Sequence, residues 1–124
     1  MSVRGGFVVE MTPVDGATPP RFQLAKTYEG PLSGTGTGEM ITAMTATEGS
    51  AAYVAIETVD GTLEGKPGTF TLVHRGVMDR GAQSLSIAVV PDSATGALAG
   101  LSGEMDIQIE ADGSHFYIFD YKLP

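Results

Sequence analysis

The chain contains no cysteine and no tryptophan, and only 7 of its residues are lysine or arginine. The absence of cysteine excludes disulfides and thiolate metal ligands. No apolar run approaches the roughly 20 residues of a membrane-spanning helix. The first residues, Met-Ser-Val-Arg-Gly-Gly, lack the apolar stretch of a signal peptide. We therefore expect a cytoplasmic protein with no membrane partner.

Negative charge predominates, because 15 aspartates and glutamates stand against 7 lysines and arginines and give a net charge of -8. A surface of this sign repels a phosphate backbone, so we expect no nucleic-acid partner. The chain has 124 residues, of which 42% are hydrophobic, and this suffices for one domain with a sizeable core. We expect a single domain over residues 1–124.

Hydrophobic side chains alternate with a period of two residues, and no segment keeps a helical period. Glycines and prolines separate these segments, and Asp-Gly pairs at 15–16, 60–61 and 112–113 are typical of turns. The alternation predicts strands at residues 5–12, 21–29, 38–47, 51–60, 68–79, 82–91, 101–111 and 114–122. Because no helix is available to cover a sheet, closing the sheet on itself is the simplest way to remove its edges. We predict an all-β fold, an eight-stranded antiparallel closed barrel with little or no helix.

A glycine–leucine motif of the form G-x-L-x-G-x-x-G occurs at residues 61–68 and 96–103, with a looser copy at 30–34. Glycine lets strands bend and approach one another closely at the corners of a barrel. A phosphate-binding loop would need a helix directly after the glycines, and none is predicted here. We therefore interpret the motif as structural.

Polar residues on otherwise apolar strand faces are the candidates for a site inside the barrel. The most informative are His74 and Lys26, which share inward faces with large apolar side chains. The residues that we expect to line the lumen are Lys26, Tyr28, Met40, Thr42, Met44, Tyr53, Phe70, Leu72, Met78 and Gln83. The methionines among them favour an adaptable apolar pocket.

Glu57 joins His74 by an argument from strand register. A hairpin centred on residues 66–67 places Val59 opposite His74 and Glu57 opposite Gly76. Cross-strand partners point to the same face, so Glu57 and His74 become diagonal neighbours inside the barrel. A slip of one residue would turn Glu57 outward.

A histidine beside a carboxylate suits acid–base catalysis, because the carboxylate orients the imidazole and raises its basicity. His74 and Glu57 are therefore the candidate catalytic residues. The alternatives are a buried histidine that is merely hydrogen-bonded and, for Lys26, a side chain that extends from a strand end to solvent. With two histidines and no cysteine we expect no metal site and no other cofactor. No G-x-S-x-G motif indicates nucleophilic hydrolysis.

Three stretches, residues 53–76, 89–103 and 117–121, contain the two full glycine–leucine motifs and the closing Tyr-Ile-Phe-Asp-Tyr. In these stretches the chain resembles a bacterial family of unknown function with an allene-oxide-cyclase-like, calycin-like barrel. The resemblance implies an eight-stranded barrel that often self-associates. It carries over no catalytic residue and only places Glu57 and His74 within the shared motif. More distant relatives of such a barrel include plant allene oxide cyclases and dirigent proteins, which steer a reactive apolar molecule by shape.

Together these features suggest a barrel that binds a small hydrophobic molecule in a mostly apolar lumen. One interpretation is a cyclase or isomerase, in which His74 and Glu57 assist with protons. The second is a non-catalytic binding or carrier protein, and the third is a filled barrel that acts only through its surface. Apolar residues expected on the outer face, such as Val54, Ile56 and Val73, further predict a homodimer or a higher homo-oligomer.

Overall fold

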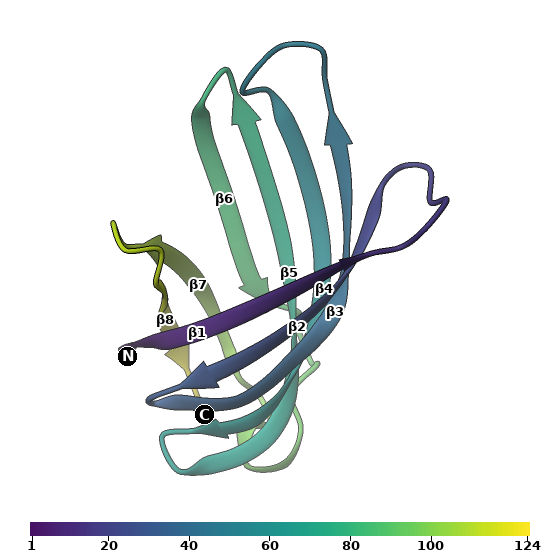
Figure 1. The fold of residues 1–124 in the computed structure, drawn as a ribbon. Helices are drawn as coiled ribbons and strands as arrows, with labels where there is room; N and C mark the ends of the chain where they lie inside the picture. Colours follow the sequence, from purple (N-terminus) through teal and green to yellow (C-terminus); the bar gives the residue numbers. More distant parts are fainter.

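The computed structural model describes residues 1–124, which form a closed antiparallel barrel whose strands follow one another in sequence order. The strands are β1 (Ser2–Pro13), β2 (Arg21–Glu29), β3 (Leu32–Met44), β4 (Ala51–Leu63), β5 (Lys66–Asp79), β6 (Ala82–Val89), β7 (Ser102–Ile109) and β8 (His115–Lys122), and the short 3-10 helix η1 spans Gly96–Leu98. Strand β8 pairs with β1 and so closes the sheet (Figure 1). The predicted all-β barrel is confirmed. The chain contains no helix that is long and apolar enough to cross a membrane.

Strand β3 begins at Leu32 rather than at residue 38 as predicted. After the buried Leu32, the next inward positions are Gly34, Gly36 and Gly38, so the alternation of apolar and polar side chains is missing there. The backbone nevertheless pairs with β2 on one side and with β4 on the other. The strand is therefore specified by its two neighbours rather than by its own side chains.

The turn between β4 and β5 lies later in the chain than the Asp60-Gly61 pair suggested. Asp60 and Gly61 belong to β4, and the turn is formed by Glu64 and Gly65. Both turn residues have positive φ, 47° for Glu64 and 83° for Gly65. Positive φ at both central positions suits a tight hairpin turn, because its twist matches that of the flanking strands.

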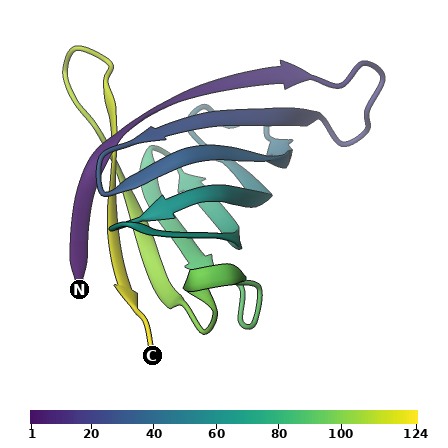
Figure 2. The same cartoon turned by 90° about the horizontal axis from the view of Figure 1, so that it is seen from below.

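One end of the barrel is filled with side chains. Leu32, Leu63 and Leu98, which are the leucines of the three glycine–leucine motifs, are completely buried there. The rings of Phe70 and Phe119 stack with their centroids 5.9 Å apart. Because burying one leucine stabilises a fold by about 1.5–3 kcal/mol, the motif strengthens this end, against which η1 packs (Figure 2).

The opposite end of the barrel is open on one side. Strands β6 and β7 pair only at Ile87 with Met105 and at Ala88 with Glu104. Residues 82–86 of β6 therefore have no partner on the β7 side, and Figure 1 shows the two strands diverging. The lumen is thus filled at one end and accessible from the other.

Candidate functional site

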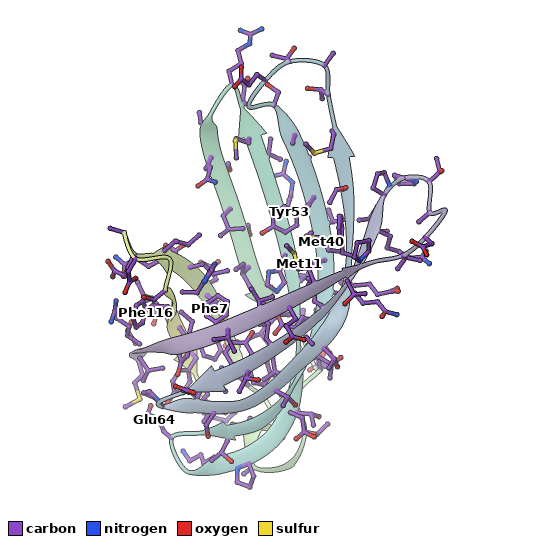
Figure 3. All side chains as sticks on the ribbon, viewed as in Figure 1. Phe7, Met11, Met40, Tyr53, Glu64 and Phe116 are labelled. Carbon is purple, nitrogen blue, oxygen red and sulfur yellow. The ribbon has the colours of Figure 1, made fainter.

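A cavity of about 390 Å³ occupies the open end of the lumen. Most of its lining is apolar, and Met11, Met40 and Tyr53 converge on it from three different strands (Figure 3). The polar side chains in its wall are Lys26, Thr42, Tyr53, His74, Gln83, Ser84 and His115. An apolar cavity with a few polar groups is the usual form of a small-molecule site.

Most of the residues expected in the lumen wall line this cavity: Lys26, Met40, Thr42, Met44, Tyr53, His74, Met78 and Gln83. Phe70 and Leu72 do not line it, because their part of β5 lies in the filled end and both side chains belong to the packed core. Tyr28 and Glu57 do not line the cavity either. They are almost completely buried behind its wall, where both contact wall residues.

Glu57 accepts three side-chain hydrogen bonds although none of its surface is exposed. Lys26 Nζ donates to Glu57 Oε1 at 2.9 Å, and His74 Nε2 lies 2.8 Å from the same oxygen. The hydroxyl of Tyr28 donates to Oε2. A buried carboxylate is tolerated when a cation balances its charge and donors occupy its oxygens, and both conditions are met here. Nowhere in the chain do three or more histidine, aspartate or glutamate side chains gather as metal ligands would.

Glu57 reaches Lys26 across an intervening strand that has no inward side chains between the two residues. Lys26 is on β2 and Glu57 is on β4, while on β3 between them Gly36 pairs with Lys26 and Gly38 pairs with Glu57. A Cβ at Gly36 would overlap the carboxylate, and a Cβ at Gly38 would overlap the backbone of β4. Sequence reasoning missed this role of the glycines. The signal was present as glycine at every second position over residues 34–38, which leaves one strand face bare.

The contacts within the cluster shift the pKa values of Glu57 and Tyr28. Burial alone would raise the pKa of Glu57, but the hydrogen bond from His74 and the positive charge of Lys26 outweigh burial, and the pKa lies below its ordinary value. Burial and the adjacent Glu57 charge raise the pKa of Tyr28 far above its ordinary value, so that Tyr28 remains a neutral donor. The cluster therefore holds an ionised Glu57 in direct contact with the Lys26 side chain.

His74 leaves its second ring nitrogen free for the cavity. An ionised Glu57 can only accept hydrogen bonds, so Nε2 of His74 carries the proton that is shared with it. Nδ1 has no hydrogen-bond partner within the chain. Every fully buried polar side-chain atom does have such a partner, so Nδ1 is not fully buried. Nδ1 is therefore accessible from the cavity that His74 lines. In a neutral imidazole held in this way, Nδ1 is a hydrogen-bond acceptor and a base.

The pairing of β4 with β5 differs from the predicted register. His74 lies opposite Ala55 rather than Val59, because the turn lies earlier than residues 66–67. The displacement is an even number of residues, so Glu57 and His74 both keep the inward face that was predicted. They are diagonal neighbours, as predicted, and they contact each other directly.

His115 is a cavity residue that sequence reasoning missed. The predicted strand at residues 114–122 includes His115, but no site role was predicted for it; it is the first residue of β8, it lines the cavity, and its ring centroid lies 5.4 Å from that of Phe7. The alternation that places Tyr117, Phe119 and Tyr121 inward extends back to His115 and would have assigned it to the same face. The cavity wall therefore contains both histidines of the chain.

Comparison with known proteins supports the expectation of an uncharacterised bacterial family. No curated protein matches the chain. Among solved structures, the crystal structure of a protein of unknown function from the DUF3224 family of Shewanella oneidensis is similar, with 44% sequence identity and a TM-score of 0.96. The similarity covers 100% of this chain and 97% of that one. The model of the family described as "Protein of unknown function (DUF3224)" matches residues 8–121. The chain therefore belongs to the DUF3224 family.

Proposed function

We propose that the barrel binds a small, largely apolar molecule in the open end of its lumen, where Lys26 and His74 contact the polar part of that molecule. The observation that carries this proposal is an apolar cavity of about 390 Å³ with a buried Lys26–Glu57–His74 cluster in its wall. Ligand cavities commonly measure about 300–1,000 Å³ and contain few polar groups. The cavity also counts against a barrel that acts only through its surface, because such a barrel needs no lumenal opening.

A cofactor-independent cyclase or isomerase is the form of this function that we favour. His74 would move the proton, and Glu57 would hold the imidazole in one orientation and stabilise its protonated state. The apolar walls would fix the conformation of a flexible substrate. The allene-oxide-cyclase-like character indicated by the sequence fits this proposal as an analogy of fold.

A non-catalytic carrier is the second candidate, and the exposure of the cavity mouth favours it. Met44 is 75% exposed and Met11 is 55% exposed at the open end. No segment of the chain covers a bound molecule there, so water would reach part of it. Enzymes that form reactive intermediates generally exclude water from the active site. Turnover of a substrate, rather than binding alone, separates the two candidates.

Titration with the neutral fluorescent dye N-phenylnaphthylamine tests the binding of an apolar molecule in the lumen, which both candidate functions require. We expect saturable binding with a micromolar dissociation constant, which corresponds to about 8 kcal/mol. Ala55→Phe should abolish it, because Ala55 is buried in the cavity wall opposite His74. Val54→Phe is the matched control, since the neighbouring Val54 is 52% exposed on the outer face. Absence of saturable binding to the wild type, or equal binding to both variants, would contradict the proposal.

A further inference from the structure

Lys26 and His74 present two nitrogen groups of opposite hydrogen-bonding character to one cavity. We propose that the bound molecule is a neutral apolar aldehyde or ketone with a hydrogen on the carbon next to its carbonyl group. In this proposal Lys26 donates a hydrogen bond to the carbonyl oxygen and His74 Nδ1 removes that hydrogen as a proton. The inference rests on the proposed lumenal binding and adds the chemical class of the ligand.

The arrangement of the cluster determines which group donates and which accepts. Glu57 accepts a hydrogen bond from Nε2–H of His74, which leaves a lone pair on Nδ1 toward the cavity. Lys26 has three N–H donors, of which one is used by Glu57 Oε1. Its ammonium lies 5.2 Å from the centroid of the Phe7 ring, and Phe7 also lines the cavity. The Lys26 ammonium and the imidazole ring of His74 are close neighbours, because Lys26 Nζ and His74 Nε2 lie 2.9 Å and 2.8 Å from the same Glu57 oxygen.

The charges of the cluster favour a neutral carbonyl compound over an ionic ligand. Lys26 and Glu57 already balance each other in a buried pair. A carboxylate ligand would therefore bring an uncompensated negative charge into an apolar cavity, and a cation would be repelled by Lys26. A neutral ketone adds no charge when it binds. The charge on its oxygen develops only as the reaction proceeds, so the Lys26 contact strengthens most in the transition state.

The proposed step needs no oxidant, reductant or second substrate. The C–H bond next to the carbonyl breaks, and its proton goes to Nδ1 of His74. The electron pair of that bond becomes the C=C bond of an enolate, and the former C=O π pair moves onto the oxygen beside Lys26. The imidazolium formed on His74 is stabilised by Glu57. In a β,γ-unsaturated carbonyl compound, return of this proton from Nδ1 of His74 to the γ carbon on the same face, with the C=C bond moving into conjugation with the carbonyl group, completes an isomerisation.

Exchange of hydrogen for deuterium on the carbon next to the carbonyl tests the inference. Cyclohexanone, phenylacetone and acetophenone would be incubated with the protein in deuterium oxide and followed by proton NMR. We expect the wild type to accelerate exchange, and His74→Gln or Lys26→Met to slow it by about a hundredfold or more. Arg75→Gln and Lys66→Met are the matched controls, since both residues are exposed and lie outside the cavity wall. They should leave the exchange rate unchanged.

Displacement of N-phenylnaphthylamine by the same ketones distinguishes the two proposals. Ketones that displace the dye without accelerated exchange would overturn the inference and leave lumenal binding intact. Failure of the dye itself to bind would overturn both. Acceleration that survives in His74→Gln but is lost in His115→Gln would overturn the assignment of the base.

A measurement on the wild type covers the case in which a variant fails to fold. NMR of the imidazole nitrogens should show that the neutral form of His74 is protonated at Nε2 and unprotonated at Nδ1. The opposite tautomer would overturn the inference, because Nδ1 would then have no lone pair to offer the cavity.

Discussion

Gly36 lies directly beneath the carboxylate of Glu57, so close that one added carbon atom would overlap a carboxylate oxygen. The most deeply buried acid of the barrel therefore depends on the absence of a side chain on the neighbouring strand. This dependence makes the site sensitive to a very small substitution that changes no charge and removes no hydrogen-bonding group.

Gly36→Ala should destabilise the fold by about 1–3 kcal/mol, because the added methyl group displaces Glu57 from its three donors. Dye binding in the cavity should weaken as well. Gly6→Ala is the control, since a Cβ there would meet its nearest atoms at the ordinary distances of 3.8 Å and 3.9 Å. Urea denaturation of both variants checks this prediction. Equal losses of stability would show that Gly36 has no special relation to the cluster.

Glu57→Gln should reduce the free energy of unfolding by about 3–5 kcal/mol, because it leaves the buried ammonium of Lys26 without a counter-charge. Glu39→Gln provides the comparison. Glu39 forms an exposed ion pair with Arg21 at 3.6 Å, and its loss should change stability by about 1 kcal/mol or less.

The double variant Lys26→Met with Glu57→Gln should lose less stability than the two single variants added together. Removing both charges leaves neither one buried alone. A double-mutant cycle by urea denaturation measures the coupling. Strict additivity would mean that the two side chains do not interact in solution.

Lowering the pH should reduce the free energy of unfolding, over a pH range that depends on the pKa of Glu57. The pKa of Glu57 is lower in the folded protein than in the unfolded chain, so its contribution to stability is complete above the ordinary glutamate value of about 4.3. The contribution is lost as the pH falls through the lowered value, because the unfolded chain binds the proton more tightly. We expect the unfolding free energy of Glu57→Gln to depend less on pH in this range than that of the wild type. Parallel profiles would contradict the prediction.

The chain should self-associate through the outer face of β3, β4 and β5. Ile41 pairs with Val54, and Ile56 pairs with Val73, and all four are between 39% and 54% exposed. Contiguous exposed apolar side chains of this kind favour an interface with two-fold symmetry. Light scattering at tens of micromolar should give a mass above the 12.9 kDa of one chain. Ile56→Lys should shift the mass toward the monomer, and a monomeric wild type would refute the proposed interface.

The barrel and the inward direction of most of its side chains could be predicted from alternation alone, since a period of two residues states which face a side chain takes. Alternation does not state how deep along the barrel axis a residue lies. For this reason Phe70, Leu72 and His74 were assigned to one wall together, although Phe70 and Leu72 are in the packed end and only His74 reaches the cavity.

The pairing of Glu57 with His74 could be anticipated, because a shift of the strand register by an even number of residues leaves every side chain on the same face. The contact between Glu57 and Lys26 could not be anticipated in the same way. It joins strands that are not neighbours, and it depends on the bare face of β3 at Gly36 and Gly38. A strand with glycines at its inward positions gives a weak signal in the sequence, although this bare inner face is what allows Glu57 to contact Lys26.

The short pairing of β6 with β7 makes this joint the mechanically weakest line in the barrel wall. Separating β4 from β5 would break a continuous ladder of backbone hydrogen bonds, whereas β6 and β7 are held only around Ile87 and Ala88. Local opening should therefore start along this line, and backbone amides of residues 82–86 should exchange with solvent before those of β4. We therefore expect the lumen to widen along this line rather than between the strands that pair over their full length. A molecule too long for the cavity would find its room between β6 and β7.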